Sequence, residues 1–459
     1  MFRDGGAGRL AVQRYRDRRQ KLMEREQKLM VLTGVPYGPG EETGWAYAQL
    51  PTYQEPSIMY LTGINQSKVI LLLDPKSRRS KEVLFIDKKN PAMEFWDGYR
   101  FGVGDSKSLA EVRKVTGIWD VKDIADFDSV LHEHFKKQKK KELGTFWLAG
   151  GTGGRAKAFK GDHNWNFKRR LERLLRKWKT PVGCLRNIMK SHFDLRLPLD
   201  RYDVENSLKA NRLTTEAFKA TLKGFQSFRN EFQVAGFLEG QLLMRSPYGL
   251  SFPSIVASGQ NATILHYLKN DDDFSSGELV LMDFGVRWMT MHADISRTIP
   301  VSGKYNPLQK ILYEIVLKAQ LTVQRKAKAG VTIQELNNVC WESINCSLNN
   351  EFLAVGGEYK LKYEGRPHGV SHLMGEQEHD GDPFRIYTNQ PMQAGWVISN
   401  EPGLYGKFRL RIGKKSFAEE VGIRIEDNLL ITDSGCVNLS RSMPKTVMEI
   451  ERLMASKLK

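Results

Sequence analysis

The sequence contains few cysteines and no long apolar run. None of its four cysteines belongs to a C-x-x-C pair, so they indicate neither a zinc site nor a disulfide framework; they are Cys184, Cys340, Cys346 and Cys436. This usage fits a reducing compartment. No stretch is long and apolar enough to span a membrane. We therefore expect a cytoplasmic protein that does not bind membranes.

The N-terminus lacks the apolar core of a secretory signal peptide. It is rich in arginine, which leaves a mitochondrial presequence as the alternative to a cytoplasmic location. Asp4, Asp17 and the scarcity of serine argue against that alternative.

Positive charge is in excess, with 70 Lys and Arg against 53 Asp and Glu and a net charge of +17. Such a balance raises the question of a nucleic-acid partner. The basic residues are spread along the chain, however, and no zinc-finger, RRM-type or leucine-zipper pattern is present. The one dense patch, KKQKKK at 136–141, is interpreted as a solvated helix end or loop. We do not expect nucleic acid to be a partner.

A chain of 459 residues predicts two domains, which we place at 1–180 and 181–459. In the first, helical composition at 106–115 and 124–141 alternates with strand-like runs, which predicts an α/β domain. The strand-like runs are 68–74, 82–87, 117–121 and 145–150. The basic segment 160–200 is interpreted as a linker between the domains.

The second domain mixes long helices with a late sheet. A long helical stretch is expected at about 203–245. Asn306 and Pro307 predict a helix start, with Gly330 as its end, and Thr332 with Glu335 forms a capping-box pattern for the next helix. After about residue 360 the pattern becomes strand-like, which predicts a mostly antiparallel sheet.

Acidic and histidine side chains collect beside apolar segments. Asp283 ends one strand-like run and Asp294 starts another, so a hairpin between the runs would place both carboxylates together. His368, His372 and His379 lie within twelve residues of one another. Glu401 follows an apolar strand and Glu426 is expected inside a strand; they lie in SNEPGLYG and GIRIEDN.

A buried cluster of four carboxylates and one imidazole needs positive charge, because mutual repulsion would otherwise protonate some of the carboxylates. Two divalent cations balance four carboxylates, and carboxylate-rich ligation suits Mn²⁺, with Co²⁺, Fe²⁺ and Zn²⁺ as alternatives. A pair of such ions generates hydroxide at neutral pH, which suits hydrolysis of an acyl bond. Taken singly, each residue has an ordinary reading: a lone Asp at a strand end is usually a turn former, and a lone Glu in a strand usually faces solvent.

The order Asp, Asp eleven residues later, His, Glu and Glu resembles the pita-bread metallopeptidases of family M24, which include methionine aminopeptidase, prolidase and aminopeptidase P. The local sequences MDFG, ADISRT, HGVSH, NEPGLY and GIRIED are also similar to this family. YLTGIN (60–65) and FWDGYRFG (95–102) resemble the N-terminal domain of aminopeptidase P. The resemblance implies an α/β N-terminal domain followed by an α+β pita-bread catalytic domain.

The resemblance implies a role for individual residues. The metal ligands would be Asp283, Asp294, His372, Glu401 and Glu426, with Asp294 and Glu426 bridging both ions. Glu401 would also carry a proton. The residues near the substrate would be His266, His368, His379 and, orienting a bridging ligand, Arg424. His292 has no family counterpart and is interpreted as a packing or surface residue, while Arg385 is a possible substitute for arginines that relatives carry after the His-Asp pair.

The implied activity is that of a two-metal exopeptidase that releases an N-terminal residue preceding proline. Relatives assemble into homodimers or homotetramers, so the resemblance also implies such an assembly. Two alternatives remain open at this point. One is a prolidase that acts on Xaa-Pro dipeptides, and the other is a non-catalytic pita-bread scaffold that binds protein or nucleic acid.

Overall fold

The computed structural model describes residues 9–36, 54–147, 163–363, 365–380 and 386–456. The chain divides into two compact units, Met1–Arg196 and Leu197–Lys459. The boundary expected at 180/181 lies inside the first of these units.

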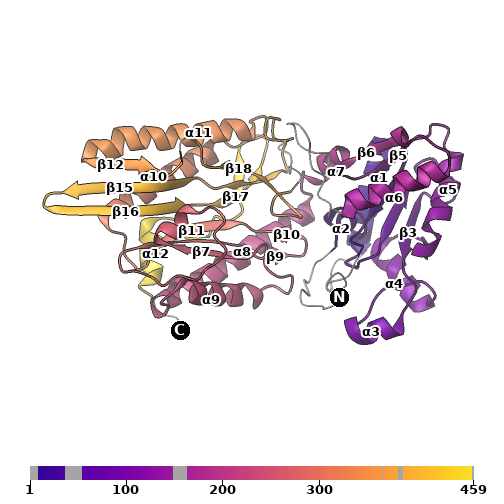
Figure 1. The fold of residues 1–459 in the computed structure, drawn as a ribbon, viewed down its shortest axis with the longest axis horizontal. Coiled ribbons are helices and arrows are strands. Elements are labelled where there is room, and N and C mark those ends of the chain that lie inside the picture. Colours follow the sequence, from indigo (N-terminus) through magenta and orange to yellow (C-terminus); the bar gives the residue numbers. More distant parts are fainter. Residues whose placement is uncertain (1–8, 37–53, 148–162, 364, 381–385, 457–459) are drawn as a thin grey trace. The chain divides into compact units, whose positions relative to one another are not determined.

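The first unit is an α/β structure (Figure 1). Its six-stranded sheet has the order β4-β3-β2-β1-β5-β6. Strands β1, β2 and β3 pair antiparallel, whereas β3–β4, β1–β5 and β5–β6 pair parallel. Buried residues of the sheet and of helices α5 and α6 form one apolar core. The strands are β1 (Leu29–Thr33), β2 (Ile70–Leu73), β3 (Glu82–Ile86), β4 (Asp120–Asp123), β5 (Leu143–Thr145) and β6 (Leu185–Asn187).

The helices of the first unit confirm two of the sequence predictions. Helix α4 occupies the expected segment, and α5 forms the central part of 124–141. The patch at 136–141 lies at the end of α5, with its five lysines exposed. The helices are α1 (Arg9–Glu26), α2 (Pro56–Thr62), α3 (Pro91–Asp97), α4 (Ser106–Thr116), α5 (Phe127–Lys137), α6 (His163–Lys177) and α7 (Met189–Arg196).

Two expectations for the first unit need correction or lie partly outside the described residues. The segment 160–200 is not a linker over most of its length, because 163–196 forms α6, β6 and α7, and β6 pairs with β5 in the sheet. Apolar residues of α6, such as Leu171 and Leu175, are fully buried, which a solvated linker would not allow. Of the strand expected at 145–150, only Thr145 belongs to a strand, the end of β5, while 146 and 147 do not and residues 148–150 lie outside the described residues.

The described residues of the second unit (Figure 1) form two helix pairs and four small sheets. Helix α8 (Arg201–Gly224) packs on α9 (Glu231–Leu243), and α10 (Pro307–Lys326) packs on α11 (Ile333–Ser347) and contacts the long hairpin β15–β16. Helix α12 (Val447–Met454) contacts α8 and α10. This α+β arrangement agrees with the expected fold class.

The helices of the second unit differ from the predictions at two points. The stretch at 203–245 is two helices, because the chain leaves the helical conformation at Phe228 and Asn230 then caps α9. Helix α10 begins at Pro307 after the predicted Asn306 cap, but it ends at Lys326 because Ala327 turns to an extended conformation and is fully buried. Gly330 lies beyond, in a left-handed conformation (φ 86°).

The strands of the second unit are all antiparallel where they pair. The sheets have the orders β11-β8-β7, β10-β9, β12-β15-β16 and β13-β14-β17-β18. They comprise β7 (Ile255–Ser258), β8 (Leu279–Phe284), β9 (Arg287–Trp288), β10 (Met291–His292), β11 (Ile295–Pro300), β12 (Gly357–Leu361), β13 (Leu373–Met374), β14 (Val397–Asn400), β15 (Gly403–Ile412), β16 (Lys415–Arg424), β17 (Asp427–Ile431) and β18 (Cys436–Asn438). The predicted late antiparallel sheet is confirmed.

In the part of the chain that the structure describes, no helix combines the length and the apolar character needed to cross a membrane.

The capping box of α11 gives a stability prediction. The hydroxyl of Thr332 accepts a hydrogen bond from the Glu335 backbone N–H at 3.0 Å, and the Glu335 carboxylate accepts from the Thr332 backbone N–H at 2.7 Å. We expect Thr332→Ala to lower the unfolding free energy by about 1 kcal/mol, because it removes this cap. Thr332→Ser, which keeps the hydroxyl, is the control. Chemical denaturation followed by circular dichroism would measure both, and equal stability of the two variants would contradict the assignment.

Candidate metal centre

A cavity of about 620 Å³ in the second unit is lined by acidic, histidine and apolar side chains. Its described lining includes five carboxylates and one guanidinium, that of Arg424. The carboxylates belong to Asp283, Asp294, Glu378, Glu401 and Glu426. All the residues proposed as ligands from the sequence therefore face one space, because His372 also lines the cavity.

The predicted hairpin places two of these carboxylates. Strand β8 pairs with β11 so that Asp283 lies opposite Ser296, and Asp294 immediately precedes β11. The side chain of Asn428 fixes the backbone of Asp294 from both sides: its amide donates to the Asp294 carbonyl at 2.7 Å and its oxygen accepts from the Asp294 N–H at 3.1 Å. The pairing expected from the sequence is confirmed, although the short hairpin β9–β10 lies between the two strands.

The two glutamates come from the late strands. Glu401 directly follows β14, and its N–H donates to the Val370 carbonyl at 3.0 Å. Glu426 lies in the break between β16 and β17, not inside a strand as expected. Its N–H donates to the Ser296 carbonyl at 3.0 Å, so the break is held by the neighbouring strand β11.

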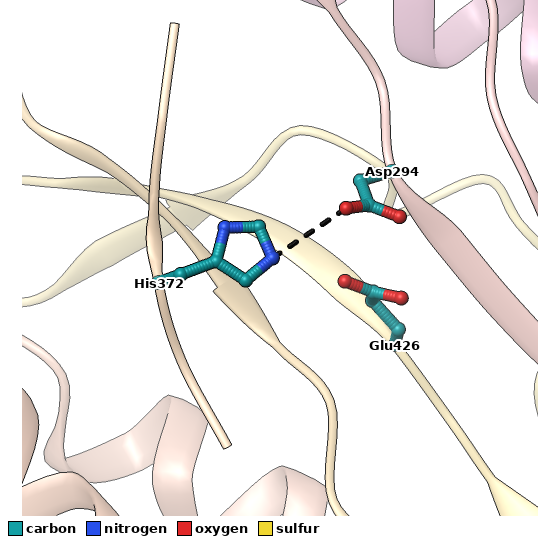
Figure 2. Close-up of side chains that lie close together, drawn as sticks. All are labelled: Asp294, His372 and Glu426. Atoms are coloured by element: carbon teal, nitrogen blue, oxygen red, sulfur yellow. Dashed lines mark ion pairs between the residues drawn. The ribbon is translucent and has the colours of Figure 1, made fainter. Parts of the chain in front are cut away.

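His372 joins the two pairs of carboxylates. Its Nε2 lies 3.5 Å from Asp294 Oδ2 and 3.4 Å from Glu401 Oε1, while its Nδ1 lies 3.1 Å from the Leu373 carbonyl. An Nδ1–H that donates to this carbonyl leaves Nε2 free as a ligand. Figure 2 shows the imidazole directed toward Asp294 with Glu426 beside it, and one ligand atom from each of the three lies within 4.8 Å of the others.

Burial and mutual repulsion act on the two most deeply placed carboxylates. The pKa of Asp294 is raised well above its usual value by burial and then by the charges of Asp283, Glu378 and Glu401. Burial, followed by the charges of Asp294, Glu401 and Asp283, raises the pKa of Glu426 in the same direction. Both carboxylates favour the protonated form unless positive charge is supplied.

The donor atoms of the cluster fit divalent cations. Asp283 Oδ1 and Glu426 Oε1 are buried and have no hydrogen-bond partner in the structure. Such orphaned carboxylate oxygens are costly unless a cation or a donor meets them. Four carboxylates and one imidazole can neutralise two ions of charge two, and this oxygen-rich set with one nitrogen suits hard to borderline metals.

Arg424 and Ser296 hold two of the candidate ligand carboxylates in place. Arg424 Nη2 donates to Asp283 Oδ2 at 2.5 Å, and its Nε donates to Ser296 Oγ at 2.7 Å. The Ser296 hydroxyl in turn donates to Glu426 Oε2 at 2.9 Å. This chain of hydrogen bonds fixes one carboxylate of β8 relative to one after β16. Ser296 lies two residues after Asp294, where strand alternation directs it to the same face, so the sequence carried a signal for it.

A buried ion pair lies behind the cluster. Arg297, which is fully buried, donates from Nη2 to Asp427 Oδ1 at 2.7 Å and from Nη1 to the Glu426 carbonyl at 2.5 Å. Lys445 Nζ lies 2.7 Å from the second oxygen of Asp427. Because every charge here has a partner, the pair fixes the backbone on both sides of Glu426 without an unpaired buried ion.

Three further histidines line the cavity, as predicted from the sequence: His266, His368 and His379. His368 Nε2 lies 3.1 Å from the Tyr405 hydroxyl and its Nδ1 lies 3.8 Å from Glu401 Oε2. The rings of His379 and His372 lie 4.2 Å apart. Burial lowers the pKa of His368, and desolvation in the cavity with the charge of His372 lowers the pKa of His379, whose side chain is 59% exposed. Both shifts favour the neutral imidazole. The Nδ1 of His368 lies 2.9 Å from the Gly369 carbonyl, so both ring nitrogens of His368 already have partners in the chain.

His292 and Arg385 stand apart from these residues. His292 lies in β10, outside the cavity lining, and burial followed by the charge of Arg287 lowers its pKa to about 3. This agrees with its interpretation as a packing residue. Arg385 lies outside the described residues.

Glu378 is a cavity residue that the sequence interpretation missed. It lines the cavity one position before His379, and its Oε1 lies 3.5 Å from His379 Nε2. The pKa of the Glu378 carboxyl is raised to about 7. Burial is the largest cause, and the negative charges of Asp283 and Glu401 act in the same direction, whereas His372 opposes the shift. Cations bound by the cluster would lower this pKa, because they oppose the negative charges. The local sequence EQEHD has no periodic pattern that would indicate which of its side chains faces the cavity.

Comparison with known proteins now identifies the family. Residues 205–433 match metallopeptidase family M24, and residues 15–143 match the N-terminal domain of aminopeptidase P. The chain belongs to metallopeptidase family M24. It is an enzyme of the metallo-aminopeptidase class, and the expected fold class, an aminopeptidase P-type α/β domain followed by a pita-bread catalytic domain, is confirmed.

Individual relatives match along most of the chain. An Xaa-Pro aminopeptidase of Haemophilus influenzae is 27% identical over 409 residues, covering 88% of this chain and 89% of that protein. The mitochondrial intermediate cleaving peptidase 55 of Arabidopsis thaliana is 24% identical over 447 residues, covering 97% and 83%. The structure of Escherichia coli aminopeptidase P with the inhibitor Pro-Leu is 25% identical, with a TM-score of 0.75 and coverage of 96% of this chain and 98% of that one.

The position of Ser296 gives a metal-binding prediction. Ser296→Ala removes the hydroxyl that bonds both Arg424 and Glu426, so we expect the affinity for Mn²⁺ to fall by about tenfold while the fold stays intact. Isothermal titration calorimetry of the dialysed protein would measure this affinity. Ser302→Ala, which changes an exposed serine outside the cavity, is the matched control. Equal affinities for the two variants would contradict the assigned contact.

Proposed function

We propose that this metallo-aminopeptidase removes the N-terminal residue from peptides whose second residue is proline. The single observation that carries the proposal is the convergence of Asp283, Asp294, His372, Glu401 and Glu426 in one cavity. The names of the Haemophilus influenzae and Escherichia coli proteins, which specify Xaa-Pro aminopeptidase and aminopeptidase P, support the choice of substrate.

These same five side chains would hold two divalent ions, for which we propose Mn²⁺. When bound, such ions lower the pKa of water and polarise a carbonyl group. Mn²⁺ suits a site with many carboxylates and a single histidine, although Zn²⁺, Co²⁺ and Fe²⁺ have related preferences. The metal that restores the highest activity to the dialysed protein would decide among them.

Glu401 is placed to move a proton. Its Oε1 accepts from the Ser399 hydroxyl at 3.2 Å, which holds the carboxylate at the cavity. In the proposed reaction Glu401 takes a proton from the attacking water and delivers it to the proline nitrogen that leaves. Asp283 lines the same cavity, so its carboxylate can accept a hydrogen bond from the free amine of the substrate.

The histidines would act on the scissile amide. His266, His368 and His379 line the same cavity as Glu401. An imidazole N–H of His266 or His379 can donate to the carbonyl oxygen as negative charge develops on it, whereas the ring nitrogens of His368 already have partners in Gly369 and Tyr405. Arg424 has a different part, because its bonds to Asp283 and Ser296 keep the ligand carboxylates in position. An Xaa-Pro bond is a tertiary amide without an N–H, so peptidases that bind that hydrogen cannot use it.

The alternatives are less well supported. The five intact ligands, the family match and the Xaa-Pro aminopeptidase relatives favour an enzyme over a non-catalytic scaffold. A prolidase would share the ligands, but the match to the aminopeptidase P N-terminal domain favours longer peptides.

A substrate panel tests the proposed function. With Mn²⁺ present, we expect release of leucine from Leu-Pro-Phe to be at least about tenfold faster than from Leu-Pro, and Leu-Ala-Phe to be a poor substrate. Chromatography of free leucine would measure all three. If only the dipeptide is cleaved, the protein is a prolidase and the proposal is wrong.

The role of Asp294 gives a second test. Asp294→Asn removes a charge from the centre of the cluster, and we expect it to abolish turnover and reduce bound metal while the far-UV circular dichroism spectrum stays unchanged. Asp433→Asn, an equal change at an exposed position, should keep full activity. Metal content by mass spectrometry should be close to two equivalents in the wild type. Turnover by Asp294→Asn at the wild-type rate would remove Asp294 from the ligand set.

The compartment and the assembly are also proposals. The cytoplasm is supported by the four free cysteines, which fit a reducing environment. The mitochondrial relative from Arabidopsis thaliana makes the organelle the alternative, and cell fractionation would distinguish the two. We propose a homodimer or homotetramer on the basis of the family, and sedimentation equilibrium would determine the state.

A further inference from the structure

Glu378 is a carboxylate of the cavity that the metal cluster does not need. The four carboxylates of Asp283, Asp294, Glu401 and Glu426 already balance two divalent ions. The guanidinium of Arg424 does not neutralise Glu378, because it is buried and bonded to Asp283 and Ser296. With cations in the cluster opposing the neighbouring negative charges, Glu378 would add a negative charge to the wall of the space that receives the substrate.

The position of Glu378 relative to the cluster follows from the histidines. The ring of His379 lies 4.2 Å from that of His372, and the Nε2 of His379 lies 3.5 Å from Glu378 Oε1. The His379 ring thus lies next to both the ring of His372, a proposed metal ligand, and the Glu378 carboxylate. The Glu378 side chain is 32% exposed, so it is accessible from the cavity.

The first residue of a substrate has to bind close to His379 and Glu378. Its carbonyl group has to reach the cluster for cleavage, and its α-nitrogen lies only two bonds from the carbonyl carbon. A group of this residue that reaches past the His379 ring to Glu378 must therefore belong to its side chain. The long stems of lysine and arginine have this reach, and their apolar part can lie along the face of an imidazole ring.

We propose that Glu378 binds the cationic side chain of the first substrate residue and so makes the enzyme prefer peptides that begin Arg-Pro or Lys-Pro. This inference rests on the proposed function and adds a specificity to it. A charge-assisted hydrogen bond between the carboxylate and a guanidinium or ammonium group carries the preference. The same carboxylate would disfavour peptides that begin with Asp or Glu through like-charge repulsion.

The test compares Arg-Pro-Phe with Leu-Pro-Phe, which have the same length and the same second and third residues. We expect the wild type to have the higher kcat/KM for Arg-Pro-Phe. Glu378→Gln should lower kcat/KM for this peptide by about tenfold, mainly through KM, and change the value for Leu-Pro-Phe by less than about twofold. Glu378→Lys should favour Glu-Pro-Phe over Arg-Pro-Phe.

Glu358→Gln is the matched control, because Glu358 lies in β12 with a side chain that is 63% exposed and outside the cavity lining. It should behave as the wild type. Equal losses on both peptides in Glu378→Gln would assign the carboxylate to the α-ammonium group and overturn the proposal, as would no loss. Loss of bound metal in this variant would make Glu378 a ligand and also overturn it. If the wild type cleaves neither Arg-Pro-Phe nor Leu-Pro-Phe, the proposed function fails first and the specificity with it.

Discussion

Repulsion among the carboxylates that line one cavity is the physical constraint that shapes the site of the second unit. Asp294 and Glu426 are almost fully buried, and burial together with their acidic neighbours favours their protonated forms. A fold that gathers such groups gains nothing from them in stability. The arrangement becomes favourable when divalent cations meet the orphaned oxygens of Asp283 and Glu426. The need of an M24 metallopeptidase for bound cations thus follows from the repulsion among carboxylates that its fold buries together.

The surrounding structure keeps these groups in place despite their repulsion. Arg424 and Ser296 link Asp283 to Glu426 through consecutive hydrogen bonds, and Arg297 with Asp427 fixes the backbone beside Glu426. These side chains come from β11 and from the segment 424–427, which lie side by side. Since the supporting residues are themselves buried and bonded, the ligand positions are set before any ion binds, which is the condition for a well-defined metal site.

Local patterns predicted those parts of the fold that local forces decide. The Thr332–Glu335 capping box, the helix start at Asn306 and the strand at 82–87 appear as expected, because side-chain caps and apolar runs act over a few residues. The predictions were wrong where tertiary packing decided. Composition made 163–196 look like a linker, yet its apolar residues are buried in the first unit. Ala327 ends α10 before Gly330, and the residues before Asn230 divide the stretch at 203–245.

The sequence by itself determined the kind of site. The family resemblance depends on the types, order and spacing of five residues, which the sequence shows directly: Asp283, Asp294, His372, Glu401 and Glu426. Only the tertiary structure decided what surrounds these ligands. It placed Glu378 on the cavity wall and His292 away from it, although both lie in segments rich in candidate groups. Which side chain faces a cavity depends on the path of the backbone through distant contacts, and that path is set by packing between elements far apart in the sequence.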